Sequence, residues 1–311
     1  MIGASNSSTL PNPDVFLNHL SPSDALEFEI SRNIVLVVLG MTIWDILVYI
    51  PKDIQIVRRS SFRCAVVSFI FARVFALAFV VLGVLERTVP FDNPRIPSKI
   101  TAFSGVFAIT CSTFLFLRRA HAVYNDTRCA QWCFSVLWFL CVAYEFVVPF
   151  GVEPAYIPGT RYYHDTILRP WIGGIGLLLL LYDTVIFLSI SYRLATSHTI
   201  SPHERITWNT LISGRALPHL SRAVLQGGQQ FYLITVGATT LIMVTMINPS
   251  FPPTLKITLS IPIAPLSASM SCRVFRNLWF LEFDSEFSSS ITNIESGCTT
   301  NITTGGINNR S

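Results

Sequence analysis

The chain has 311 residues, of which 51% are hydrophobic and only 13% charged, and its mean hydropathy is +0.51. Soluble globular domains carry about 25% charged residues, so this composition excludes an ordinary soluble domain and indicates a protein whose solvent is the lipid bilayer. The net charge of +4 does not indicate nucleic-acid binding, because the cations lie at the ends of apolar segments rather than together on one polar surface.

Apolar segments long enough to cross a bilayer, which takes about 20 residues, recur along the chain. In chain order there are seven: residues 32–50, 62–85, 98–117, 129–150, 170–192, 229–248 and 252–272. Prolines in the short "PSFPP" turn separate the last two, since proline ends one helix and suits the first turn of the next. We therefore predict an all-α fold, a polytopic membrane bundle of seven transmembrane helices between an N-terminal tail (1–30) and a C-terminal region (273–311).

The positive charges predict the orientation of this bundle. Lys and Arg are concentrated in the first, third and fifth connections and after the last helix, which by the positive-inside rule places the N-terminus outside and the C-terminus in the cytosol. No cleavable signal peptide is expected in residues 1–31, so the first helix is expected to act as a signal anchor. Asn6, in the sequon "NSS" of the outer tail, is a candidate glycosylation site. The predicted location is a membrane, either the plasma membrane or an endomembrane.

Two cytosolic regions show amphipathic patterns. The connection 193–228 contains the helix-start signature "SPHE" and the stretch "LPHLSRAVLQ"; it is either a surface helix on the inner leaflet or a docking site for a cytosolic partner. After the last predicted span, "RVFRNLWFLEF" is expected to lie along the inner leaflet, which makes the adjacent Cys272 a candidate palmitoylation site. The remaining tail is rich in Ser, Thr, Asn and Gly and is expected to be disordered.

Four ionisable residues fall inside the predicted spans: Asp45, Arg73, Glu145 and Asp183. An Asp or Arg at the centre of a membrane helix costs at least about 2.5–3.5 kcal/mol, so such residues face the bundle and find partners there. We therefore predict that these four form a buried polar network. Glu145 lies five residues from the predicted outer end of its helix. We expect it to be close enough to the membrane–water interface to be hydrated.

Helix direction suggests which of these charges meet. At 1.5 Å per residue, Asp45 lies ~7 Å and Arg73 ~16 Å from the predicted inner ends of their helices. Side chains lean toward the N-terminus of their own helix, so the two heads lean toward each other. We predict an Asp45–Arg73 pair, with Asp183 as the competing partner of Arg73. The pair acts either as a lock on helix register or as a switch or relay that opens in function.

Several functional classes lack the residues they need. A retinal protein needs a lysine deep in the last span, whereas Lys256 lies near its outer start. The six histidines are scattered in connections, and no zinc signature, nucleotide-binding loop or nucleophile elbow is present. The sequence therefore predicts no enzyme activity, no cofactor and no metal site, and it identifies no ligand.

The architecture resembles that of G-protein-coupled receptors, but the acidic-Arg-aromatic triplet and the Asn-Pro-x-x-Tyr motif of the rhodopsin class are absent. Five blocks, "WDILVYIPKDIQIV", "FLRRAHAVYN", "YDTVIFLSISYRL", "LPHLSRAVLQGGQQFYLITVG" and "SMSCRVFRNL", together resemble a family of uncharacterised polytopic membrane proteins of basidiomycete fungi. The resemblance implies seven helices, a membrane location and no established activity. We expect a receptor-like sensor or a membrane interaction protein; the alternative is a proton- or ion-coupled transporter that uses the embedded carboxylates.

Overall fold

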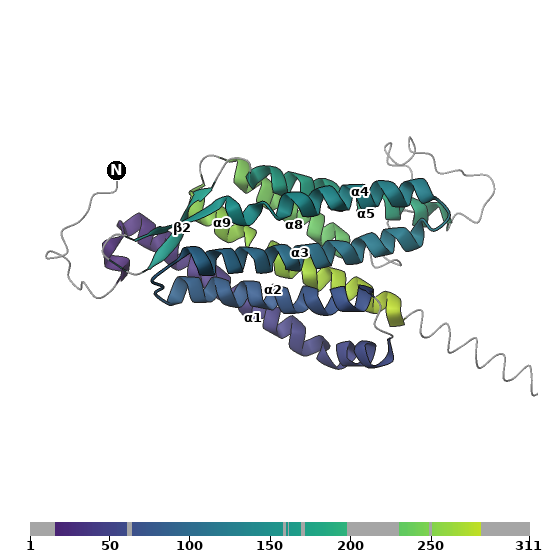
Figure 1. Ribbon diagram of the computed structural model, residues 1–311, viewed down its shortest axis with the longest axis horizontal. Coiled ribbons are helices and arrows are strands. Elements are labelled where there is room, and N and C mark those ends of the chain that lie inside the picture. Colours follow the sequence, from purple (N-terminus) through teal and green to yellow (C-terminus); the bar gives the residue numbers. More distant parts are fainter. Residues whose placement is uncertain are drawn as a thin grey trace, which may run out of the picture.

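The computed structural model describes residues 16–60, 64–157, 160, 162–168, 172–197, 230–248 and 251–280. In these residues the chain forms an elongated bundle of helices lying lengthwise beside one another, with a small two-stranded sheet at one end (Figure 1). We call the end with the sheet the hairpin end, and the opposite end, where α1 finishes and α2 and α4 begin, the distal end. Asn6, most of the connection 193–228 and the tail after Phe280 lie outside the described residues.

The helices and strands have the following bounds in chain order: η2 Phe16–His19, α1 Pro22–Arg59, α2 Cys64–Thr88, α3 Arg95–Val123, α4 Arg128–Glu145, η3 Val148–Phe150, β1 Val152–Tyr156, β2 Tyr163–Leu168, α5 Ile172–Ser197, α8 Gln230–Ile247 and α9 Pro253–Ser260. After a turn at 261–262 the chain is helical again over 263–280, which we call the final helix. Six helical segments in the described part are long and apolar enough to cross a membrane, the last of them being Thr254–Phe280, which includes the turn at 261–262; Leu233–Ile247 of α8 is a shorter apolar helix. The all-α bundle expected from the sequence is thus present, with the β1–β2 hairpin added to it.

Helix α1 is longer than the sequence predicted. It begins where expected for a capped helix, with Ser21 accepting a hydrogen bond from the Asp24 N–H and Pro22 in the first turn. The predicted span ends at Ile50, but the helix continues through Pro51 to Arg59. Proline costs the helix one backbone hydrogen bond, which membrane helices tolerate where neighbouring helices hold the chain in place.

The expected span 129–150 agrees with a candidate span Arg128–Phe150, but its last residues are not regular α-helix and a hairpin follows. α4 ends at Glu145, and Pro149 lies in the short 3-10 helix η3 that follows. Strands β1 and β2 then pair antiparallel, from Val152 opposite Leu168 to Tyr156 opposite Tyr163. The register shifts between Glu153 and Pro154, as expected because proline has no N–H to donate to a ladder.

The predicted last span 252–272 is broken into two helices and extends further than expected. Pro262 lies in the turn at 261–262 and Pro265 in the first turn of the final helix, where its missing N–H costs nothing. The final helix runs on to Phe280, so the predicted boundary at 273 lies inside a helix. Figure 1 shows this C-terminal helix, in yellow-green, beside α2.

Small residues allow α2 and α3 to pack closely. Ala72 and Ala76 of α2 and Ala108 of α3 are at most 2% exposed and lie in one apolar cluster with residues of the final helix. Gly105 of α3 lies directly against the ring of Phe79 on α2. Close approach at small residues is the usual source of helix association in a bilayer, where apolar surface alone gives no preference for protein over lipid.

The Gly105 contact gives a test of this packing. A methyl group added in Gly105→Ala would lie 2.9 Å from the nearest Phe79 ring atom, so we expect a loss of about 1–3 kcal/mol in the free energy of unfolding. The measurement is denaturant titration of the detergent-purified protein. Gly40→Ala is the control: an added methyl meets nothing within 4 Å, and the change should be neutral or stabilising by up to ~1 kcal/mol. Equal effects of the two substitutions would contradict the packing.

Candidate functional site

The distal end holds a network of ion pairs between α1, α2 and the final helix. Asp45, Tyr49 and Asp53 are spaced four residues apart, so they lie along one face of α1. Arg73 of α2 reaches both carboxylates: its Nη2 is 3.3 Å from Asp45 Oδ2 and its Nη1 is 3.0 Å from Asp53 Oδ2. One guanidinium therefore spans two turns of α1.

The final helix supplies the remaining cations of this network. Arg273 Nη2 lies 2.8 Å from Asp45 Oδ1, and Arg276 Nη1 lies 2.9 Å from Asp53 Oδ1. The guanidinium carbon of Arg276 is 3.9 Å from the centre of the Tyr49 ring, a cation–π contact between the two carboxylates. Each carboxylate is thus bound by one arginine from α2 and one from the final helix.

Burial makes this network sensitive to the loss of a charge. The side chains of Asp45 and Asp53 are 14% exposed, Arg73 is 10% exposed and Arg276 only 3%. The group contains three guanidiniums and two carboxylates, a net charge of plus one. Desolvated ions are tolerated only while they are paired, so removing a carboxylate leaves the excess positive charge uncompensated.

The structure places the predicted Asp45–Arg73 pair in contact, but it adds three residues that the sequence analysis missed: Asp53, Arg273 and Arg276. Asp53 lies beyond the expected helix end, and both arginines were assigned to a segment on the membrane surface. The spacing of Asp45 and Asp53 was the available signal, since eight residues are close to two helical turns.

Cys272 lies beside the same network and is not accessible for acylation. It is 0% exposed, and its Sγ lies 3.7 Å from the backbone oxygen of Phe69. The final helix turns the thiol into the bundle instead of presenting it at a membrane surface, so palmitoylation of this cysteine would require the final helix to move.

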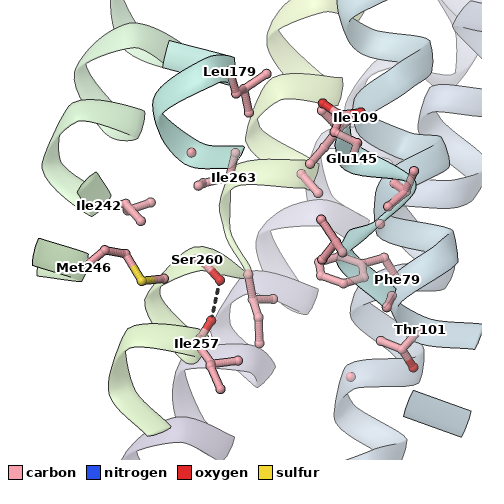
Figure 2. Close-up of a pocket in the computed structure, with 18 of the residues that line it drawn as sticks. Phe79, Thr101, Ile109, Glu145, Leu179, Ile242, Met246, Ile257, Ser260 and Ile263 are labelled. Carbon is pink, nitrogen blue, oxygen red and sulfur yellow. Dashed lines mark hydrogen bonds between the residues drawn. The ribbon is translucent and has the colours of Figure 1, made fainter. Parts of the chain in front are cut away.

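A cavity of about 240 Å³ lies nearer the hairpin end, between α2, α3, α5, α8, α9 and the start of the final helix. Its walls are largely apolar, and Figure 2 shows Phe79, Ile242 and Ile263 projecting toward the space from different helices. Met243 and Met246 add flexible, polarisable side chains from α8. The ionisable lining residues are Glu86, Arg87 and Glu145.

Glu145 is buried at the wall of this cavity. It is 3% exposed, so the expectation that it is hydrated is wrong. α4 ends at this residue, and the η3 turn and the hairpin follow it in the chain. Thr110 donates a hydrogen bond of 3.2 Å to Glu145 Oε2. Glu145 Oε1 has no hydrogen-bond partner among the described residues.

Asp183 of α5 lies within electrostatic range of Glu145. The carboxylates paired with Arg73 in the described part of the chain are instead Asp45 and Asp53, so Asp183 is not seen as its competing partner there. It is 3% exposed, and its Oδ1 also has no hydrogen-bond partner in the described part of the chain. The four residues predicted to form one network therefore separate into two groups, Asp45 with Arg73 and Glu145 with Asp183.

Polar side chains at the other end of the cavity connect four helices. Thr101 of α3 donates a hydrogen bond of 2.5 Å to Glu86 Oε1 on α2. Arg87 donates from Nε to Ser31 Oγ of α1 (3.1 Å) and from Nη1 to the Gly83 carbonyl (3.0 Å). Ser31 in turn lies 2.6 Å from the hydroxyl of Thr258 on α9. Two guanidinium nitrogens of Arg87, Nε and Nη1, thus already donate to other groups of the protein.

The lining of the cavity is mostly apolar, with three ionisable residues among it. No group of three His, Cys, Asp or Glu residues that could hold a metal ion occurs in the described ranges. A mostly apolar cavity with a few converging polar groups is typical of a small-molecule site.

No protein-family model matches this chain, and a comparison with the curated proteins finds no match.

The ion network predicts an unequal cost for its two central charges. Asp45→Asn leaves three guanidiniums with one carboxylate, and we expect it to lower the free energy of unfolding by about 2–4 kcal/mol. Arg73→Gln leaves two of each sign and should cost at most about half as much. Denaturant titration of the purified protein measures both.

The control is Asp126→Asn, which removes the exposed Asp126–Arg193 pair and should cost less than ~1 kcal/mol. If Asp45→Asn costs no more than this control, or less than Arg73→Gln, the charge balance assigned to the network is wrong.

Proposed function

We propose that this protein is a multi-pass membrane protein with seven transmembrane helices, its N-terminus outside and its C-terminus in the cytosol, and that it acts as a receptor-like sensor. The hairpin end then faces outward and the distal end faces the cytosol. A small molecule binds in the cavity, and the response is a change in the ion network at the cytosolic end.

One observation carries this proposal: α2 and the final helix each contribute residues both to the wall of the cavity and to the ion network. α2 contributes Phe79 and Gly83 to the cavity and Arg73 to the network. The final helix contributes Ala264 to the cavity and Arg273 to the network. A ligand that shifts either helix changes the geometry of both sites, which is the physical requirement for coupling between them.

The distribution of charge supports the orientation. Lys52, Arg58 and Arg59 follow the apolar part of α1 at the distal end, and Arg128 begins α4 there. Basic residues at one end of successive spans favour the cytosolic side for that end.

A proton- or ion-coupled transporter remains the second candidate, because Glu145 and Asp183 lie near each other in the bundle interior and each has an oxygen without a partner among the described residues. Buried carboxylates of this kind are typical of proton relays in membrane proteins. Loss of proton-coupled uptake in Asp183→Asn, in a protein whose network variants transport normally, would favour the transporter over the sensor.

The proposed orientation predicts which native cysteines are reached from each side of the membrane. Cys64 and Cys129 are exposed at the distal end. A membrane-impermeant maleimide applied to intact cells should therefore label them only after the cells are permeabilised. Arg95→Cys, at the start of α3 and the opposite end of the bundle, is the control in a cysteine-free protein and should react without permeabilisation. The reverse pattern would overturn the orientation.

Cys272 reports whether the ion network is a switch or a rigid lock. In a protein whose other cysteines are replaced by serine, this buried thiol should react slowly, and Asp45→Asn should speed its reaction about tenfold or more because opening the distal end becomes less costly. Asp126→Asn is the matched control and should leave the rate unchanged. An unchanged rate in Asp45→Asn would show a rigid lock and contradict the sensor proposal.

A further inference from the structure

We propose that the cavity binds a small apolar amine, a molecule of about one aromatic ring or a short alkyl chain whose protonated nitrogen pairs with Glu145. The inference rests on the proposed sensor function and names the chemical class of its ligand.

The volume of the cavity limits the size of this ligand. At about 240 Å³ it is larger than the ~150 Å³ cavity that accommodates benzene, and smaller than the ~300–1,000 Å³ of sites for drug-sized molecules. A single ring with one or two further heavy atoms fits between these limits.

The lining determines that most of the ligand is apolar. Phe79, Ile109, Ile242 and Ile263 come from α2, α3, α8 and the final helix, and Figure 2 shows them around one space. Burying an apolar body among such side chains is favourable in proportion to the area removed from water. The ring of Phe79 also offers its face to a nearby cation.

Glu145 supplies the specific polar contact. Its side chain is almost completely buried and lines the cavity, Thr110 occupies one carboxylate oxygen, and Oε1 has no hydrogen-bond partner in the described part of the chain. Buried acceptors are nearly always satisfied, so an unpaired carboxylate oxygen at a cavity wall is a site that a ligand donor completes.

Charge selects an amine over a neutral donor. The cavity is lined by two acids, Glu86 and Glu145, and Asp183 lies within electrostatic range of Glu145. The cation among the lining residues, Arg87, already donates to Ser31 and to the Gly83 carbonyl. A protonated amine brings a positive charge to these acids, and its hydrogen bond to a carboxylate is about twice as strong as one between neutral groups.

The test compares three probes of nearly equal size: benzylamine, benzyl alcohol and toluene. Saturation-transfer NMR on the full-length protein in lipid nanodiscs measures binding, and empty nanodiscs of the same lipid correct for partitioning. We expect benzylamine to bind about ten- to a hundredfold more tightly than toluene, with benzyl alcohol between them. Equal affinity for the three probes would overturn the proposal without any variant being needed.

Two variants locate the site. Glu145→Gln should remove the preference for benzylamine, and Ile263→Phe, which fills the cavity, should weaken all three probes. Val244→Phe is the matched control: Val244 of α8 is 60% exposed and lies outside the lining, so the change should leave binding unchanged. A preference for benzylamine that survives Glu145→Gln would overturn the assignment.

The rate of Cys272 labelling separates this inference from the sensor function. If benzylamine binds selectively and changes the labelling rate of Cys272, the result supports both the amine site and the sensor function. Selective binding with no change in labelling supports the amine site and overturns the sensor role. No preference for benzylamine overturns the amine site, whatever the labelling shows.

Discussion

The bundle depends on the contact of two carboxylates of α1 with three arginines from two other helices. Few residues of α1 are buried, and Trp44 and Met41 of this helix are 70% and 67% exposed. In a bilayer such an apolar surface gives a helix no reason to prefer protein over lipid. The position of α1 along its neighbours is therefore specified by polar contacts, with Asp45 and Asp53 at the distal end and Ser31 at the hairpin end.

The sequence was sufficient for the parts of the fold and site that follow from helix periodicity and direction. It predicted apolar helices, and it predicted that Asp45 and Arg73 lean toward each other. It did not predict the other half of the network, because Pro51 favoured a helix end that tertiary contacts override. The separation of Asp183 from Arg73 could not be predicted either, since it depends on which helices are neighbours, a property of packing rather than of any one segment.

The break at 261–262 lies between the cavity and the ion network. Ser260, Ile261 and Ala264 all line the cavity, and the helix that restarts there carries the arginines of the network one to two turns beyond Ala268. A short helix followed by a proline-containing turn lacks the continuous backbone hydrogen bonds of an unbroken span. The wall of the cavity is thus the least regular part of the element that leads to the network.

The two pairs of embedded acids differ in what they do for the fold. Each carboxylate of the Asp45–Asp53 pair is bound by two guanidiniums, so those acids specify register and are satisfied by the protein. Glu145 and Asp183 instead lie near each other, and each has an oxygen without a hydrogen-bond partner among the described residues. Such unsatisfied oxygens cost stability. A cost of this kind at the wall of a cavity is better explained by a ligand or a proton than by packing.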